Sequence, residues 1–354
     1  MTEALDISIT KAERSKLQDI SLENIPFGKY FTDHMLEANY EDGEWTSVEI
    51  KPYQPLLMEP SLAALHYGQA IFEGIKAYKT NDGNAFIFRP IDNFKRFNKS
   101  ARRMNMPAVP EEIFMEGMRQ LIALDKEWIP GKKDHSLYIR PVMFSTDAML
   151  GVRPSETYKF LIILSPTGPY FASPMKILVE EQYTRAAPGG VGFSKNAGNY
   201  GGSMLAASLA KEKGYDQVLW TDANEHRWLQ EVGMMNVFFI INNFAITPSL
   251  EEGTILEGVT RASVMQGLLE MGIPVEERKI SIDEVVEAYK DGKISEVFGT
   301  GTAAVIAPIK ELNYKGFEMH FNTDNYAISG SVKKWLADIR EGRVPDKYGW
   351  MVKV

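Results

Sequence analysis

Val191-Gly-Phe-Ser-Lys195-Asn-Ala-Gly-Asn-Tyr200-Gly-Gly202 is the stretch from which the architecture of this chain is best inferred. It holds one lysine, Lys195, among small residues, and Tyr200 follows five positions later. Its glycines remove side-chain bulk and let the backbone come close to a bound molecule. A lysine amine in such a slot can form a Schiff base with a carbonyl compound. Because a lysine in a Gly-rich loop is more often a solvated surface cation, other segments must supply complementary groups.

The composition is that of a globular protein without cysteine chemistry. The 354 residues suffice for about two domains, and 44% of them are hydrophobic and 24% charged. The net charge of −8 argues against nucleic acid or an anionic membrane as partner. The absence of cysteine excludes disulfides, thiolate nucleophiles and cysteine zinc sites, and the five scattered histidines lack metal-ligand spacing.

The N-terminal segment and the longest apolar run indicate where in the cell the protein is expected. Residues 1–8 carry early acidic residues and no long apolar core, which argues against a signal or transit peptide. The run Val237–Ile241 is too short to span a bilayer. We therefore expect a cytoplasmic protein that binds neither membrane nor nucleic acid.

Strand-like and helix-like segments alternate along the chain, which predicts a mixed α+β fold. Strands are expected at 86–88, 136–144, 159–164, 175–179, 217–220, 235–241, 244–247, 296–298 and 303–306. Helices are expected at 90–106, from 110, at 203–213, at 259–271 and from 281. No Gly-x-Gly-x-x-Gly follows a strand, so a dinucleotide-binding fold is not indicated.

Three prolines within Ser165–Pro174 mark the predicted domain boundary. Such a stretch is unfit for either helix or strand. We predict a smaller N-terminal α/β domain (1–167), a linker (168–178) and a larger C-terminal domain (179–354) that carries Lys195.

Two segments favour a bound phosphate. In 256–263 a glycine and a threonine precede a predicted helix, whose free amides and dipole attract an anion. In Phe298-Gly-Thr-Gly-Thr-Ala303 small residues let successive amides converge on one point. For each segment alone, a helix cap or a tight turn is the favoured interpretation. Together with Lys195 they point to a phosphorylated aldehyde, pyridoxal 5′-phosphate (PLP).

Three further residues would complete such a site. Arg96, on the predicted helix 90–106, could contact the phosphate. Glu231 precedes the apolar strand 235–241, where its carboxylate could hold the proton on the PLP ring nitrogen. Tyr200 could hydrogen-bond the ring oxygen. The residues alone leave open a solvated arginine, an exposed turn acid and a packed aromatic.

Read together, these motifs resemble the branched-chain amino acid aminotransferases, which are fold-type IV PLP enzymes, and above all their eukaryotic-like branch. The matching segments lie in collinear order at 27–35, 66–78, 88–96, 136–141, 150–152, 168–171, 195–201, 231–236 and 299–303. The resemblance implies two domains with the cofactor in the cleft between them. It also implies transamination of L-leucine, L-isoleucine and L-valine with 2-oxoglutarate, which gives branched-chain 2-oxo acids and L-glutamate.

The resemblance assigns roles position by position. Lys195 matches the catalytic lysine that holds the cofactor aldehyde. The cofactor contacts it implies are Arg96, Val259, Thr260 and Thr302 at the phosphate, Tyr200 at the ring oxygen and Glu231 at the ring nitrogen. The substrate contacts it implies are Phe27, Tyr67, Phe72, Tyr138, Arg140, Leu150, Val152, Tyr170 and Ala303. In the homodimer that it implies, Leu150 and Val152 reach the site of the other subunit.

The chain departs from the family pattern at two places. Met234 stands where the family commonly has threonine, so the amides near Thr302 and Ala303 are expected to bind the substrate carboxylate. Ala304 and Ala307 replace the Cys-x-x-Cys pair of vertebrate members, so a thiol switch is impossible.

Three other functions stay open on the sequence. One is another fold-type IV enzyme, such as a D-amino acid aminotransferase or an aminodeoxychorismate lyase. The second is a non-catalytic PLP- or metabolite-binding protein. The third is a lysine-dependent aldolase, which would need no phosphate-binding segments.

Overall fold

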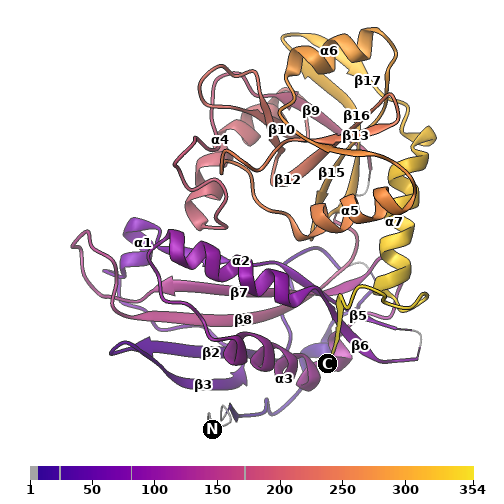
Figure 1. Ribbon diagram of the computed structural model, residues 1–354. Coiled ribbons are helices and arrows are strands. Elements are labelled where there is room, and N and C mark those ends of the chain that lie inside the picture. Colours follow the sequence, from indigo (N-terminus) through magenta and orange to yellow (C-terminus); the bar gives the residue numbers. More distant parts are fainter. Residues whose placement is uncertain (1–6, 24, 81, 171–172) are drawn as a thin grey trace. The chain divides into compact units, whose positions relative to one another are not determined.

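The computed structural model describes residues 7–23, 25–80, 82–170 and 173–354, and they form two compact units (Figure 1). Unit 1 takes in the described residues of Met1–Tyr170, Ser194–Gly198 and Ile339–Val354, and unit 2 those of Phe171–Phe193 and Asn199–Asp338. Both units mix helices with strands, which confirms the α+β prediction. The predicted domain limits stay a prediction, and residues 171–172 of the linker lie outside the described residues.

Unit 1 is built on one mostly antiparallel sheet. Its strands are β1 (Ser8–Ile9), β2 (His34–Glu41), β3 (Glu44–Pro52), β4 (Ala70–Phe72), β5 (Ile75–Lys79), β6 (Ala85–Phe88), β7 (Ser136–Ser145), β8 (Tyr158–Thr167) and β18 (Met351–Lys353). They pair in the order β1-β3-β2-β8-β7-β5-β6-β18, and β4 also pairs with β7. The long β7–β8 ladder joins Ser136 to Thr167 at one end and Ser145 to Tyr158 at the other.

Helices cover one face of this sheet. They are α1 (Ala63–Tyr67), α2 (Pro90–Arg103) and α3 (Gly117–Leu124), with short turns η1 (Lys16–Asp19), η2 (Glu112–Glu116) and η3 (Lys126–Trp128). Pro90 stands in the first turn of α2, a position where its missing N–H costs no hydrogen bond. Phe97 and Ala101 of α2 pack with Phe114 and Phe160 in the core. The predicted helix 90–106 is thereby confirmed, although it ends at Arg103.

Unit 2 contains a closed ring of strands. The strands are β9 (Met175–Val179), β10 (Gln217–Thr221), β11 (Leu229–Val232), β12 (Met235–Ile241), β13 (Phe244–Thr247), β14 (Val275–Glu277), β15 (Ile294–Gly301), β16 (Val305–Tyr314) and β17 (Phe317–His320). The order β11-β10-β9-β16-β15-β12 returns to β11, because β11 also pairs with β12. The strands β13 and β14 continue from β12, and β17 pairs with β16. Side chains such as Val237, Phe239 and Leu312 fill the interior of unit 2.

The remaining helices are α4 (Ala197–Glu212), α5 (Val259–Glu270), α6 (Ile282–Lys290) and α7 (Ala327–Arg340), with the short turn η4 (Thr323–Asn325). Ser281 caps α6, since its Oγ accepts the Glu284 N–H at 3.1 Å, as the sequence predicted. In the part of the chain that the structure describes, no helix has the length and apolarity needed to cross a bilayer.

Other predicted boundaries also differ from the structure. The helix expected at 203–213 begins at Ala197, so Gly198, Gly201 and Gly202 lie inside it despite the low helix propensity of glycine. The strand expected from Ala303 begins at Val305, so residues 302–304 form the turn between β15 and β16.

Candidate active site

Lys195 is fixed in unit 1 through its backbone. Its N–H donates to Ser100 Oγ on α2 at 2.9 Å, and its carbonyl accepts the N–H of Phe72, the last residue of β4, at 3.0 Å. The next residue, Asn196, forms an isolated antiparallel bridge with Ile71. The side chain is half-buried, and its Nζ lies 5.0 Å from the centroid of the Phe72 ring. Lys195 is therefore held in place, unlike a lysine in a solvated loop.

A fully buried carboxylate, Glu73, follows Phe72 and pairs with α2. Its Oε1 accepts from Arg96 Nε at 2.7 Å, and its Oε2 accepts from Arg96 Nη2 and Asn93 Nδ2, both at 2.8 Å. Burial alone would raise the pKa of Glu73. The charge and hydrogen bonds of Arg96, together with the charge of Lys195, outweigh burial and hold that pKa below its ordinary value. Glu73 is therefore ionised at neutral pH and fixes the plane of the Arg96 guanidinium.

The aromatic side chains predicted for the substrate gather in unit 1. The Phe27 ring meets Tyr138 and Tyr170 edge-on, with ring centroids 4.8 and 5.0 Å apart. The Arg140 guanidinium carbon lies 4.6 Å from the centroid of Phe72, and Arg140 Nη2 donates to the Tyr138 hydroxyl at 3.0 Å. Phe72 thus contacts both this group and the amine of Lys195. Such a lining suits an aliphatic side chain and places one cation beside it.

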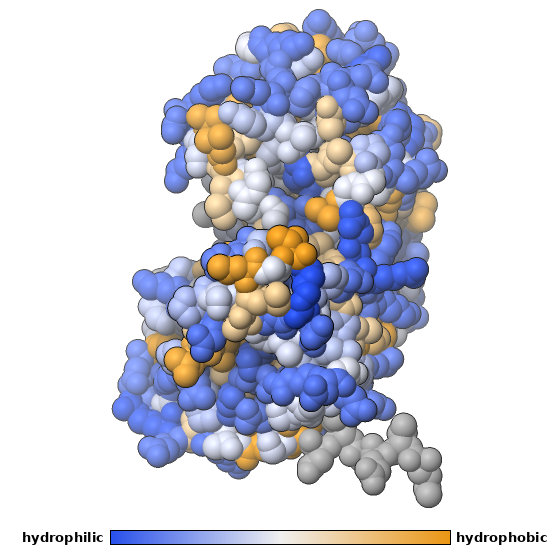
Figure 2. All heavy atoms as spheres, turned by 90° about the vertical axis from the view of Figure 1, so that its left-hand side faces the viewer, coloured by the Kyte–Doolittle hydropathy of each residue, from blue (hydrophilic) through white to orange (hydrophobic). Residues whose placement is uncertain are grey.

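Three more of the predicted substrate residues lie at an exposed edge of unit 1. The Tyr67 hydroxyl donates to the Leu150 carbonyl. The exposed fractions are 42% for Tyr67, 63% for Leu150 and 85% for Val152. Figure 2 shows apolar side chains gathering on this face of unit 1, over α1 and the loop after β7. An exposed apolar patch of this kind marks an interaction surface.

Glu231 is a buried carboxylate of unit 2 with two partners. Its Oε2 lies 3.1 Å from Arg185 Nε, and its Oε1 accepts the Leu256 N–H at 2.9 Å. The side chain of Glu231 is 5% exposed and that of Arg185 7%. A carboxylate offers about four lone-pair sites, so two contacts leave capacity for another donor. The sequence alternative of an exposed turn acid does not hold.

A row of polar side chains crosses the strands next to Glu231. Glu231 on β11 faces Asn236 on β12, and Asn236 faces Thr300 on β15. Asn236 Nδ2 donates to the Leu256 carbonyl at 3.0 Å, so Leu256 is held by both Glu231 and Asn236. Thr300 Oγ1 is buried and has no hydrogen-bond partner among the described residues. An unsatisfied buried hydroxyl here fits a site that receives a polar ligand.

The loop held by this row leads into α5. Gly258 is the N-cap of α5 and offers no side chain to its first amides. A Cβ at this position would lie 2.0 Å from Asn236 Oδ1, so the backbone approach requires glycine. The amides of Val259 and Thr260 therefore stand at a helix N-terminus that a phosphate can occupy.

The turn between β15 and β16 carries Thr302 and Ala303. Val305, which closes the turn, has a φ of 61°. A β-branched residue rarely adopts this left-handed conformation, and such strain is typical of ligand-binding turns.

Two other residues considered from the sequence, Tyr200 and Met234, lie in unit 2. Tyr200 lies near the start of α4 and is half-buried. Met234 stands in the turn between β11 and β12 and is 51% exposed. The predicted residues therefore divide between the two units.

Several residues of these networks were missed from the sequence, among them Glu73, Asn93, Ser100, Arg185 and Asn236. A signal existed for those on α2. Positions 93, 96 and 100 recur at helical spacing on the face that also buries positions 97 and 101, so polar residues interrupt an apolar stripe. For Glu73, Arg185 and Asn236, no pattern in the sequence indicates the contact.

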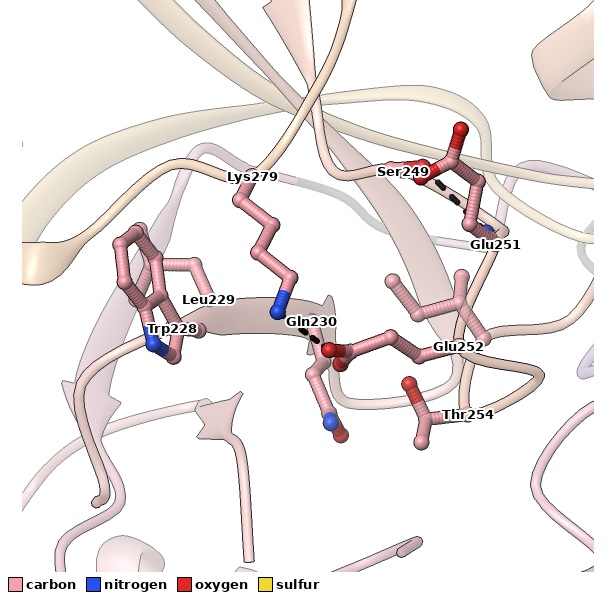
Figure 3. A pocket seen from close by; sticks show the side chains of 9 residues that line it. Trp228, Leu229, Gln230, Ser249, Glu251, Glu252, Thr254 and Lys279 are labelled. Carbon is pink, nitrogen blue, oxygen red and sulfur yellow. Dashed lines mark hydrogen bonds and ion pairs between the residues drawn. The ribbon is translucent and has the colours of Figure 1, made fainter. Parts of the chain in front are cut away.

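Unit 2 also has a small pocket, which is not a candidate site for the cofactor (Figure 3). It is lined by Trp228, Leu229, Gln230, Ser249, Glu251, Glu252, Thr254, Ile255 and Lys279. Its volume of about 20 Å³ admits a water but not a cofactor. Lys279 is engaged there by the Glu252 carboxylate.

The residues present fit PLP. A lysine is held beside aromatic side chains, a buried carboxylate retains lone pairs, and a helix begins on uncapped amides. A buried arginine with a fixed plane adds a cation suited to phosphate.

Known proteins show the same architecture. The amino-transferase class IV family model matches residues 70–312. The branched-chain-amino-acid transaminase 1 of Bacillus subtilis (strain 168) is 48% identical over 337 residues, 94% of each chain. The crystal structure of a branched-chain aminotransferase from Thermoproteus uzoniensis with norvaline is similar at a TM-score of 0.74 and 26% identity, covering 90% of this chain and 99% of that one. The branched-chain amino acid aminotransferase from Escherichia coli has a TM-score of 0.71 at 26% identity, with 90% of this chain and 98% of that one covered.

Proposed function

The chain belongs to the class IV aminotransferases, and from that premise we propose that it is a branched-chain amino acid transaminase. It transfers the amino group of L-leucine, L-isoleucine or L-valine to 2-oxoglutarate, which yields the branched-chain 2-oxo acid and L-glutamate. PLP is the cofactor, as in class IV aminotransferases generally. The observation that carries the proposal is that the backbone of Lys195 is hydrogen-bonded to both Ser100 and Phe72. The Phe72 ring also contacts the Arg140 guanidinium.

PLP would be held by the residues that the resemblance to the family indicates. At the phosphate we place Arg96, the amides of Val259 and Thr260, and Thr302. Glu231 takes the ring nitrogen and Tyr200 the ring oxygen. When bound, PLP supplies an aldehyde carbon that accepts the amino group and a ring that withdraws electrons.

Lys195 is the base. Its Nζ takes the α-proton of the amino acid and holds it until the return step. Because Ser100 and Phe72 fix the backbone, only the side chain has to move. The positive charge of Lys195 acts on the buried Glu73 and contributes to the lowered pKa of that carboxylate.

The aromatic lining selects the substrate by shape. Phe27, Phe72, Tyr138 and Tyr170 offer an apolar surface to an aliphatic side chain. One methylene in such a pocket is worth about 1–3 kcal/mol, so slower use of methionine and phenylalanine is expected. The distal carboxylate of glutamate then needs a cation, and we assign Arg140 to it, with the amides near Ala303 binding the α-carboxylate.

The assembly we propose is a homodimer. The exposed apolar patch around Tyr67 would be covered by the second copy, and Leu150 and Val152 would reach the partner's site. The cytoplasmic location expected from the sequence stays a prediction.

An absorbance experiment on the purified protein tests the function. The visible band of lysine-bound PLP should disappear when L-isoleucine is added and return with 2-oxoglutarate. Lys195→Ala should lose both the band and turnover, and full activity in that variant would overturn the proposal. A coupled assay of L-leucine against D-alanine separates this function from a D-amino acid aminotransferase, and a protein that binds PLP but leaves the band unchanged would be non-catalytic.

A further inference from the structure

Arg185 contacts three segments that surround the proposed ring-nitrogen site in unit 2. Its Nε lies 3.1 Å from Glu231 Oε2. Its Nη2 donates to the carbonyl of Gly192 at 3.3 Å and to that of Thr254. Within the described residues, no other cation pairs with Glu231. Because Nε makes no aligned hydrogen bond in that part of the chain, its contact with Glu231 is an ion pair.

We propose that Arg185 is a positioning residue that places the proton shared by Glu231 and the cofactor ring on the ring nitrogen. The inference rests on the proposed function, in which Glu231 faces that nitrogen. Arg185 itself would touch neither substrate nor cofactor.

One proton has two possible sites, the Glu231 carboxyl group and the cofactor ring nitrogen. In a buried setting an isolated carboxylate favours its neutral form, since an unpaired charge is costly there. The proton would then rest on the carboxyl group and leave the ring nitrogen neutral. A guanidinium 3.1 Å from Oε2 stabilises the carboxylate anion instead, so the proton moves to the nitrogen.

The geometry keeps both charges in place. The Leu256 N–H donates to Oε1 of Glu231, so each of the two carboxylate oxygens has a partner. Arg185 is anchored by two carbonyls in turn. A Cβ on Gly192 would lie 2.5 Å from the Thr254 carbonyl oxygen, so glycine is needed for these segments to converge on the guanidinium.

The consequence for catalysis is electronic. A protonated ring nitrogen withdraws electrons from the carbon that loses its α-proton. Loss of Arg185 should therefore slow α-proton transfer, even where the cofactor remains bound.

The test observes the proton directly. Holoenzyme is prepared with PLP labelled with ¹⁵N in the ring, and ¹⁵N NMR distinguishes a protonated from a neutral pyridine nitrogen. Arg185→Met removes the charge at similar length, and Arg185→Lys keeps it. Lys279→Met is the matched control, because it removes another ion pair of unit 2, with Glu252, just before Thr254. Glu231→Gln gives the reference signal without the carboxylate.

We expect wild type, Arg185→Lys and Lys279→Met to show the protonated signal, and Arg185→Met to move to the Glu231→Gln position. Single-turnover α-proton transfer from L-leucine should fall on the order of tenfold or more in Arg185→Met. If that variant does not fold, Arg185→Gln, which keeps an amide donor but no charge, must show the same shift. A wild-type signal in either uncharged variant overturns the inference about Arg185. A wild-type signal in Glu231→Gln overturns the assignment of Glu231 itself, and failure of the wild type to bind PLP overturns the function.

Discussion

Replacing Glu73 by glutamine should destabilise the apoenzyme strongly, because the substitution breaks a buried ion pair. The side chain keeps its volume, but Arg96 loses an anion that accepts from it at 2.7 and 2.8 Å. Glu73 is fully buried and Arg96 is 8% exposed, so water cannot replace the lost charge. Removing one partner of such a pair costs about 3–5 kcal/mol. At roughly 2–4 °C per kcal/mol for a domain of 150–250 residues, the unfolding midpoint should fall by about 6–20 °C.

The assay is thermal unfolding of the apoenzyme at neutral pH, followed by circular dichroism. The matched control is Glu116→Gln, since Glu116 also accepts two hydrogen bonds from one arginine, Arg119, at 2.8 and 2.6 Å. That pair is exposed, with 38% and 43% of the two side chains accessible, and should be worth about 0–1 kcal/mol. Equal shifts in the two variants would refute the claim that burial makes the Glu73 pair important.

Three further outcomes are expected. Gly258→Ala places a Cβ 2.0 Å from Asn236 Oδ1, so the Asn236 side chain or the N-terminus of α5 must shift, and the cofactor Kd, measured by equilibrium dialysis, should rise about tenfold; an unchanged Kd would contradict the phosphate assignment. Gly74→Ala places a Cβ 2.1 Å from the Tyr138 hydroxyl, so the KM for L-leucine should rise about tenfold in steady-state assays while cofactor binding stays as it was. Because the pKa of Glu73 is lowered, its contribution to stability is complete above its ordinary value of 4.5 and is lost as the pH falls through the folded-state value. The difference in unfolding midpoint between wild type and Glu73→Gln should therefore shrink as the pH is lowered from 7 to 3, and a difference that stays constant would contradict this.

The elements that sequence reasoning predicted are those whose signal is local. Helix α2 was found because Phe97 and Ala101 recur at helical spacing and Pro107 stops the pattern. Strand β12 was found because Met235–Ile241 is apolar at every position but one, and the structure shows all seven residues to be buried. In both cases a short window holds the information that fixes the element.

The contacts that hold Lys195 could not be read in this way. Ser100 and Phe72 lie 95 and 123 positions earlier in the chain, and neither residue type indicates a hydrogen bond to a distant backbone. The same holds for Arg185 and Glu231, which lie in different segments of unit 2 and form their ion pair only in the folded chain. The resemblance to a known family identified Lys195 and Glu231 as site residues. The residues that contact and support them were identified only from the folded structure.

The buried face of α2 shows what these supporting residues do. A helix selected only for packing would carry apolar side chains at positions 93, 96 and 100, since a buried ion pair seldom stabilises a fold more than well-packed apolar residues do. Here each of the three polar side chains contacts Glu73 or the backbone of Lys195. The lower stability of such a buried polar network is explained if the network serves to fix the lysine and to orient the Arg96 guanidinium. An apolar α2 could leave the fold intact, but Lys195 would then lose the Ser100 contact and Glu73 would lose its counter-charge, and the site would lose its geometry before the protein lost its structure.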